Sequence, residues 1–597
     1  MNCEPASPFI RRLRNRISLV KIPFTERGSR LLLFRENSHL LIRLAERWYQ
    51  WENEVGHYRK RLPLIDLFAL LDENGNKVDF QLTSYPHALC FETRLGRFWL
   101  SFIDEESLLL TLPPGRVGLT FRVYAVRGRA DRRGGEFKGD PEHRRTHRNV
   151  AYTTNAGVLN NVLTEEADGY LGVRLDLDAQ ERSAFVLNIT PRLGLNRSIP
   201  PIETVLQAAE QRWHAWFAAV PPVDAAYQDQ YYYAWWVLRA GLLSSRFFLT
   251  REAMIPSMAH YVGVWAWDAY FHALAYRHVD SGLAENQLRA LIDHQTPEGM
   301  IPDAVYDEGI ITHWKLPGSD KEAEVTKPPL LAWAALKLYE KSGHLDFIDE
   351  LYEPLQRARR WWFEQSDDDH DGIMQYNHPN SSGLDDSPLW DDGMPVEAPD
   401  LNTYLVMQAD ALARMADILD LPEDAERLRA EAADLTNRLI AHSWDPEAGV
   451  FWAMSDDHRR VPTLTPFNLY PLLTGRLPPD ISDRLIAHLT NPDEFWAEYP
   501  LRTVSRSDPK YDPMQMWRGP TWVNINYLFI EALTPRYPEI ARTLRERTLA
   551  LMLQQPDIHE YYNPDTGAPP PQAASVFGWS CAVFVDLAIQ ASRDKEP

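Results

Sequence analysis

The feature of this sequence that most constrains its fold is the 3.6-residue recurrence of apolar side chains after Tyr227. That period is typical of amphipathic α-helices with one face turned to a core. It returns in eleven blocks, at about residues 227–246, 267–280, 282–296, 329–342, 346–363, 401–419, 422–441, 480–489, 519–532, 537–553 and 575–591. Long loops rich in Asp, Asn, Gly and Pro join the eleven blocks. Their number is close to what six helical hairpins closed into a double ring would require. We therefore expect an (α/α)₆ toroid, with an α-solenoid as the alternative that periodicity alone leaves open.

The N-terminal third has the pattern of an all-β domain. Its short segments are rich in Leu, Val, Phe and Tyr and lie at 30–44, 64–71, 98–102, 108–112 and 117–126. Turn residues separate them, most clearly at 72–76, where Asn-Gly tolerates the positive φ angles of a tight turn. Together these features predict a β-sandwich.

A Pro-containing joint at 198–203 separates the two patterns. A short helical block follows it and ends at Pro221 and Pro222. The sequence therefore predicts a multidomain chain, with a β-sandwich over 1–200, a linker helix over 201–222 and an all-α (α/α)₆ catalytic barrel over 223–597.

The charge balance excludes some partner classes. The net charge is −22, from 62 basic and 84 acidic residues, so nucleic acid and anionic membrane surfaces are poor partners. No apolar run is long enough to span a bilayer. The three cysteines lack disulfide or metal spacing and no export signal is evident, so we expect a reducing, cytoplasmic compartment. The sequence does not predict the oligomeric state.

Aromatic residues point to a carbohydrate partner. Of the 20 Trp residues, 17 follow residue 210. A Trp ring can cover the C–H face of a sugar while its N–H remains free to donate. The alternative interpretation is that these rings fill a large helical core.

Four segments concentrate acids, amides and Trp where a helical core would have aliphatic residues. They lie at 264–271, 381–393, 515–522 and 559–567. Cleaving a glycosidic bond requires one carboxylic acid to protonate the leaving oxygen and a second carboxyl group to activate water or to attack carbon. The second and fourth segments supply Asp385 and Glu560 for these tasks.

The surroundings of Asp385 suit a general acid. Gly383 permits a sharp turn before it, and Pro388 fixes the loop beyond it. Burial beside Trp390 is expected to raise the pKa of Asp385 toward the value that proton donation needs. Taken alone, this loop also fits a helix N-cap or a turn, Glu560 also fits a surface acid, and Asp386 is the main rival to Asp385.

In their order and spacing, the four segments resemble the bacterial members of glycoside hydrolase family 63. That group contains mannosylglycerate and glucosylglycerate hydrolases and processing α-glucosidases. The segments are more distantly similar to trehalases of family 37. The resemblance covers about residues 225–595.

The resemblance implies a role for individual residues. It makes Asp385 the general acid and Glu560 the general base, and it places Asp268 on hydroxyls of the sugar, with a helix N-cap as the alternative role. It also implies a pocket lined by Trp267, Trp390, Trp517, Arg518 and Trp579. Tyr561 beside the base and Gln295 on the 295–299 loop are further candidate sugar-binding residues, and loop hydrogen bonding is the alternative for Gln295.

The implied reaction is a single displacement with inversion on an α-glucoside or α-mannoside, such as glucosylglycerate or a short α-gluco-oligosaccharide. Inversion requires carboxyl groups about 6.5–9.5 Å apart. Arg518, Trp314 or Lys315 are candidates to meet an anionic glycerate. The alternatives are a disaccharide phosphorylase, a trehalase-like enzyme, a sugar epimerase on the same barrel, or a sugar-binding protein without catalysis.

No cofactor is expected, with one qualification. Asp367, Asp369 and Asp371 alternate as in a calcium loop, but His378 occupies the twelfth position, where a bidentate Glu should close the site. Structural calcium and a polar turn are the two interpretations.

Overall fold

The computed structural model describes residues 4–47, 62–140 and 148–594. These residues form two compact units, each described here by itself. The first unit comprises the described residues up to Val220, together with Tyr231–Ser244 and Ser257–Val262. The second comprises Pro221–Gln230, Ser245–Pro256 and the described residues from Gly263 onward. The boundaries predicted from the sequence, near residues 200 and 223, stay predictions.

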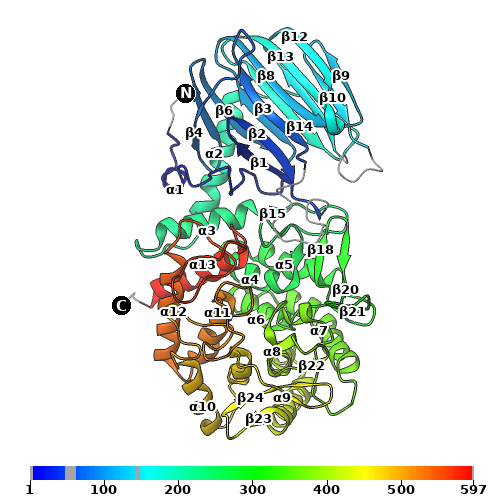
Figure 1. Ribbon diagram of the computed structural model, residues 1–597, viewed down its shortest axis with the longest axis vertical. Helices are drawn as coiled ribbons and strands as arrows, with labels where there is room; N and C mark the ends of the chain where they lie inside the picture. Colours follow the sequence, from blue (N-terminus) through cyan, green and yellow to red (C-terminus); the bar gives the residue numbers. More distant parts are fainter. Residues whose placement is uncertain (1–3, 48–61, 141–147, 595–597) are drawn as a thin grey trace. The chain divides into compact units, whose positions relative to one another are not determined.

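Two antiparallel sheets make up most of the first unit, drawn in blue to cyan in Figure 1. One sheet has the order β1 (Leu31–Glu36), β2 (His39–Leu44), β3 (Ile65–Leu71), β8 (Gly115–Tyr124), β13 (Tyr170–Ala179) and β12 (Gly157–Glu165). The other has the order β4 (Gln81–Ser84), β5 (Leu89–Thr93), β6 (Gly96–Asp104), β7 (Ser107–Thr111), β14 (Ala184–Thr190), β11 (Asn149–Thr154), β10 (Gly134–Lys138) and β9 (Arg127–Asp131).

Aromatic rings from both sheets meet in the core of this unit. Phe121 of β8 lies 5.5 Å from Tyr152 of β11 and 6.0 Å from Phe185 of β14, measured between ring centroids. Side chains alternate between opposite faces of a strand, so each sheet turns one apolar face to the other. The predicted β-sandwich is confirmed.

One strand prediction needs correction. The segment 30–44, predicted as a single strand, forms the hairpin β1–β2. The chain reverses at Asn37, whose φ is +52°. Asn adopts this left-handed conformation more readily than most residues, so a short turn interrupts an otherwise continuous apolar pattern.

The sandwich unit also contains the helices α1 (Pro8–Arg12) and α2 (Ile202–Ala218) and most of α3 (Gln228–Ala240). Ile202 and Val205 of α2 pack against Leu109 and Val186 of the second sheet. The segment predicted as a linker helix therefore packs on the sandwich.

The second unit consists of helices in two layers, preceded along the chain by α3 (Gln228–Ala240). The inner helices are α4 (Ala266–Tyr276), α6 (Leu331–Ser342), α8 (Pro399–Ile418), the 3₁₀ helix η7 (Pro466–Thr474), α11 (Val523–Leu533) and α13 (Gly578–Arg593). The outer helices are α5 (Ser281–Ile292), α7 (Leu345–Gln365), α9 (Pro422–Ser443), α10 (Pro479–Leu489) and α12 (Pro538–Met552).

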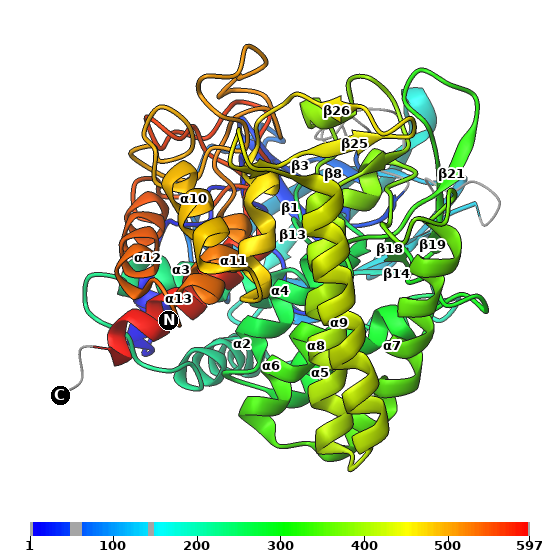
Figure 2. The ribbon, with the colours of Figure 1, turned by 90° about the horizontal axis from the view of Figure 1, so that it is seen from below.

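Burial distinguishes the two layers. Every residue of α4 is buried, whereas α9 buries a single stripe that includes Ala425, Leu428, Ala432 and Leu435. A helix that is apolar all round must be surrounded by protein, and a helix with one apolar stripe covers a surface. In Figure 2, α7, α10 and α12 lie at the periphery of these helices.

The inner helices close into a ring. α4 contacts α6, α6 contacts α8, α8 contacts η7, η7 contacts α11, α11 contacts α13, and α13 returns to α4. This closure excludes the solenoid and confirms the predicted toroid. Sequence periodicity missed η7 because this helix is short and contains Pro466 and Pro471, which a helical pattern does not normally include.

Inner and outer helices alternate along the chain, and the loops that join them are of two lengths. Connections from an inner to an outer helix are short, at 277–280, 343–344, 419–421, 475–478 and 534–537. Connections from an outer helix to the next inner helix are long, at 293–330, 366–398, 444–465, 490–522 and 553–577. The long loops therefore all reach the N-terminal ends of inner helices, and these ends lie on one side of the ring.

Short elements outside these layers complete the chain. The strands are β15 (Leu242–Leu243), β16 (Ala253–Met254), β17 (Val264–Trp265), β18 (Ala304–Tyr306), β19 (Gly309–Ile311), β20 (His313–Lys315), β21 (Glu322–Glu324), β22 (Val396–Glu397), β23 (Trp444–Asp445), β24 (Val450–Phe451), β25 (Ala453–Ser455) and β26 (Arg460–Val461). Within the described ranges, none of the helices combines the length and apolar character that crossing a bilayer requires.

Candidate active site

The N-terminal end of the inner ring collects the acids that the sequence singles out. Asp268 lies in the first turn of α4, Asp385 lies in the 366–398 loop, and Glu560 lies in the 553–577 loop. These positions are separated by more than a hundred residues, and the alternation of inner and outer helices brings their segments to one end of the ring.

Backbone geometry and one hydrogen bond fix the loop that carries Asp385. Gly383 has a φ of +75°, and a Cβ atom there would lie 3.3 Å from the ring of Trp267. A side chain is therefore disfavoured at this position by both strain and contact. A hydrogen bond spans Asp385: Nε1 of Trp390, which follows it in the loop, donates to the carbonyl oxygen of Leu384, which precedes it, at 2.8 Å.

The carboxyl group of Asp385 is both accessible and desolvated. Its side chain is 41% exposed, yet the surrounding protein desolvates it and raises its pKa to about 6, with Lys327 opposing this rise and Asp303 and Asp386 adding to it. Such a pKa suits proton donation near neutral pH.

A buried lysine links Asp385 to a second acid. The Nζ of Lys327 lies 2.9 Å from Asp303 Oδ1 and 4.0 Å from Asp385 Oδ1. Burial acts to lower the pKa of Lys327, but the charges of Asp303 and Asp385 outweigh it and the pKa is raised. Lys327 therefore stays charged and limits the rise in the pKa of Asp385. Sequence analysis missed this residue because one Lys before two Pro residues gives no signal.

Glu560 and Asp268 complete the cluster. Glu560 is buried, and its Oε2 accepts a hydrogen bond from the Ala574 backbone N–H at 3.3 Å. Burial and the charge of Glu560 raise the pKa of Asp268 well above its ordinary value, while Lys327 acts against the rise. Asp268 Oδ1 has no hydrogen-bond partner among the described residues. Protonation of Asp268 is therefore favoured, and it lies within the electrostatic reach of both Glu560 and Lys327.

Asp386, the rival acid, is held by the 490–522 loop. Its Oδ1 accepts a hydrogen bond from the Trp517 backbone N–H at 2.7 Å, and its Oδ2 accepts one from Gln515 Nε2 at 3.2 Å. By contrast, no hydrogen bond to the Asp385 carboxyl is found among the described residues. Asp386 thus joins two loops.

Aromatic rings form a wall beside the acids. Trp517 and Trp522 are stacked with centroids 3.7 Å apart, and Trp522 stacks on Tyr561 at 4.8 Å. Trp579 contacts Trp522 edge-on at 5.4 Å and Trp267 at 6.1 Å. All five rings are buried, and their contact with a sugar stays a prediction. Sequence reasoning included the segment of Trp522 but did not select the residue, which is the centre of the stack.

Two predicted sugar-binding residues have other partners. Gln295 donates from Nε2 to the Gly299 and Pro354 carbonyl oxygens at 2.8 Å and accepts from Arg357 at 2.6 Å. Its amide is therefore used in loop hydrogen bonds, and a sugar-binding role for Gln295 stays a prediction. Trp390 supports the Asp385 loop through the hydrogen bond described above.

The three residues predicted to meet a glycerate carboxylate each have a carboxylate partner within the protein. Arg518 binds both carboxylate oxygens of Asp391 at 2.9 and 2.7 Å. Lys315 lies 3.3 Å from Asp320. Trp314 donates to Asp303 at 3.4 Å, which places it next to the Lys327 pair.

The acidic loop at 367–372 has three carboxyl groups close together, those of Asp367, Asp369 and Asp371. Backbone N–H groups of the loop donate to all three, as in a polar turn. Calcium binding here stays a prediction.

Comparison with known proteins identifies a family whose sequence profile this chain matches. The profile of the mannosylglycerate hydrolase MGH1-like glycoside hydrolase domain matches residues 261–580. The chain is similar to the mannosylglycerate hydrolase of Thermus thermophilus, with 26% identity over 402 residues that cover 55% of this chain and 95% of the relative. It is also similar to the glucosylglycerate hydrolase of Mycolicibacterium hassiacum, with 24% identity over 419 residues that cover 55% of this chain and 92% of the relative.

A solved structure matches the whole chain. A bacterial glucoamylase crystallised with acarbose has a TM-score of 0.62 and 13% identity, covering 100% of this chain and 96% of that one. At this identity the likeness concerns the fold alone. The match covers the full length of the chain, and so includes the β-sandwich.

Proposed function

Because the chain belongs to the mannosylglycerate hydrolase MGH1-like glycoside hydrolases, within glycoside hydrolase family 63 as its sequence resemblance predicts, we propose that it hydrolyses a small α-glucoside or α-mannoside with inversion. A glycoside of glycerate is the leading substrate, since relatives of both sugar types carry that name. A short α-gluco-oligosaccharide is the alternative substrate.

The observation that carries this proposal is the state of Asp385. Its carboxyl is open to water, lacks a hydrogen-bond partner among the described residues, and has a pKa raised to about 6. A general acid needs all three properties, because it must reach the leaving oxygen, keep its proton until the reaction, and release it at neutral pH. We assign this role to Asp385.

Glu560 is the proposed general base. It takes one proton from a water molecule as the water oxygen bonds to the anomeric carbon. The bond from that carbon to the glycosidic oxygen breaks in the same step, and the proton of Asp385 goes to the departing oxygen. Attack from the face opposite the leaving group inverts the anomeric configuration.

Asp268 is the proposed sugar-binding acid. Its raised pKa favours the neutral carboxylic acid, which both donates and accepts hydrogen bonds. Its partnerless Oδ1 supports a hydroxyl group of the substrate as the missing partner, since a buried polar atom without a partner is costly.

Product stereochemistry tests the mechanism. Hydrolysis of an α-linked substrate, followed by proton NMR from the first minute, is expected to show the β-anomer of the free sugar before mutarotation. Initial release of the α-anomer would exclude inversion. A panel of glucosylglycerate, mannosylglycerate and neutral α-disaccharides tests the substrate class, and equal kcat/KM on the neutral sugars would remove the preference for glycerate.

Substitutions test the two carboxyl groups. Asp385→Asn and Glu560→Gln are each expected to lower kcat by a factor on the order of 10² to 10⁴ with an unchanged circular dichroism spectrum. Asp386→Asn is the matched control, because it alters the adjacent acid that only joins loops. Loss of activity in the Asp386 variant together with retention in the Asp385 variant would reverse the assignment.

Phosphate dependence separates a hydrolase from a phosphorylase. A phosphorylase replaces the activated water with phosphate, so it releases a sugar phosphate and stops when phosphate is removed. We expect activity in phosphate-free buffer and free sugar as the product.

A further inference from the structure

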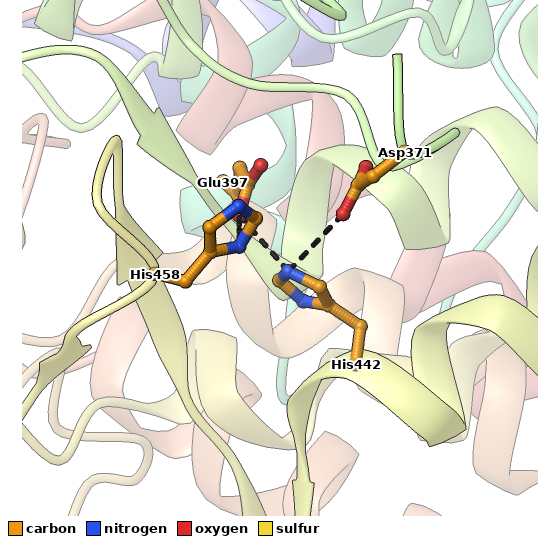
Figure 3. Close-up of side chains that lie close together, drawn as sticks. All are labelled: Asp371, Glu397, His442 and His458. Atoms are coloured by element: carbon orange, nitrogen blue, oxygen red, sulfur yellow. Dashed lines mark ion pairs between the residues drawn. The ribbon is translucent and has the colours of Figure 1, made fainter. Parts of the chain in front are cut away.

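Four side chains from separate elements converge on one point in the second unit, and none of them is one of the active-site acids. They are Asp371 in the loop after α7, Glu397 in β22, His442 in the last turn of α9, and His458 in the turn between β25 and β26. Their candidate ligand atoms all lie within 4.8 Å of one another. Figure 3 shows both imidazole rings and both carboxylates turned toward the same small space.

The spacing of these atoms matches a small ion. His442 Nε2 lies 3.0 Å from Glu397 Oε2 and 3.6 Å from Asp371 Oδ2, and His458 Nδ1 lies 3.6 Å from Glu397 Oε2. A tetrahedral Zn²⁺ with ligands at about 2.0–2.1 Å holds neighbouring ligand atoms about 3.3 Å apart. Small adjustments would therefore place all four atoms around one ion.

Each histidine also has a second partner of the kind that orients metal ligands. The far nitrogen of His458, Nε2, lies 2.9 Å from Asp369 Oδ2. The far nitrogen of His442, Nδ1, lies 3.0 Å from the hydroxyl of Ser443. Metal-binding histidines commonly bond through their second nitrogen to such a group, which fixes the ring and its tautomer.

Glu397 supplies an independent observation. Its side chain is 4% exposed, and its Oε2 has no partner with hydrogen-bond geometry among the described residues. Two histidine nitrogens, His442 Nε2 at 3.0 Å and His458 Nδ1 at 3.6 Å, approach this buried oxygen. That oxygen is the atom toward which both imidazoles point.

The ligand set selects the class of ion. Calcium takes six to eight oxygen ligands, whereas imidazole nitrogen favours zinc and related transition metals. Asp369, one of the calcium-like triad at 367–371, also pairs with His458 Nε2 at 2.9 Å. The two nitrogen and two oxygen donors fit a closed, four-coordinate structural site.

We propose that Asp371, Glu397, His442 and His458 bind one divalent transition-metal ion, with zinc as the expected metal. The ion has a positioning role. Two of its ligands, Asp371 and Glu397, bracket the segment 372–396, which carries Asp385. Binding clamps both ends of this segment to α9 and to the β25–β26 turn.

Metal content tests the site directly. The full chain, stripped with EDTA and dialysed, is titrated with Zn²⁺, Mn²⁺ and Ca²⁺ in competition with a chromophoric chelator, and bound metal is counted by mass spectrometry. One Zn²⁺ per chain and a higher melting temperature with Zn²⁺ are expected, since a ligand that binds only the folded state stabilises it. Absence of bound Zn²⁺, or binding of Ca²⁺ alone, would overturn the proposal.

Variants locate the ion. His442→Ala and His458→Ala are each expected to lower Zn²⁺ affinity at least 100-fold, and Asp369→Asn 10- to 100-fold as a supporting partner. The control is His344→Gln, which changes a half-exposed histidine paired with Glu285 at 2.7 Å. Unchanged Zn²⁺ affinity in both histidine variants would refute the site.

A spectroscopic readout covers the case in which these variants fail to fold. Co²⁺ added to the unsubstituted stripped protein is expected to give the intense visible absorption of a tetrahedral site. The weak bands of octahedral cobalt would count against this geometry.

Discussion

The lysine between two acids gives the sharpest test of the active-site electrostatics. Lys327→Met removes a positive charge 4.0 Å from Asp385 Oδ1 while keeping most of the side-chain volume. Lys327 lowers the pKa of Asp385, so its loss raises that pKa. The proton donor then persists to higher pH, and the alkaline limb of the kcat/KM profile moves upward.

The size of this shift follows from the geometry. Two unit charges 4.0 Å apart interact by about 4 kcal/mol at an effective dielectric constant near 20 and by about 1 kcal/mol in water. Because the Asp385 side chain is 41% exposed, solvent screening places the effect toward the lower end, at about 1.5–2.5 kcal/mol. At about 1.4 kcal/mol per unit, the pKa rises by roughly 1–2 units from its value of about 6.

The assay is kcat/KM from pH 4 to 9 for the wild type and two further variants. Lys327→Arg keeps the charge and is expected to keep the alkaline limb near the wild-type position. Lys337→Met removes a lysine paired with Glu531, away from the acids, and should leave the profile unchanged. An alkaline limb that stays fixed or moves down in Lys327→Met would refute the assigned electrostatics.

Three further predictions concern packing and stability. Trp522→Ala removes the centre of the aromatic stack and is expected to cost about 3–5 kcal/mol in chemical denaturation; a cost below 1 kcal/mol would show that the stack is not a packing unit. Asp586→Asn breaks the pairs with Arg277 at 2.8 Å and His278 at 2.6 Å. Burial acts to raise the pKa of Asp586, but these partners hold it well below the usual range, so its stabilisation is present above about pH 4 and lost as pH falls. We expect a loss of about 3–5 kcal/mol at pH 7 that shrinks below pH 4, and a pH-independent loss would contradict this. Gln295→Ala should leave KM within about twofold and cost about 1–2 kcal/mol in unfolding free energy; a tenfold rise in KM would place Gln295 in the sugar site after all.

Several features of the fold were accessible from the sequence because they are local. A helix that covers a core repeats its apolar residues every 3.6 positions wherever it lies in the chain, and the predicted blocks correspond to α3 through α13. The turn at 72–76 is likewise local, and Gly75 has the expected positive φ of +81°. The helix η7 escaped because prolines replace the periodic pattern there.

Only part of the candidate site could be predicted from the sequence. The segments of Asp385 and Glu560 were identified by their composition and by their resemblance to a family, which single residues in isolation do not provide. Lys327 and Asp303 carry no such pattern, yet after burial they are the groups that most affect the pKa of Asp385, Lys327 lowering it and Asp303 raising it. The aromatic segments were predicted to line a sugar pocket; in the structure their rings are buried against one another, and their contact with a sugar stays a prediction.

The sequence by itself determined the two fold classes, most of the helices and the order of the acidic segments, since each depends on a few consecutive residues. Only the tertiary structure decided which carboxyl groups are desolvated, which cations are already paired, and that Asp371, Glu397, His442 and His458 meet at one point. These properties depend on distances between residues far apart in the chain. Such distances are fixed when the ring of helices closes, because burial and Coulomb interactions act through space rather than along the backbone.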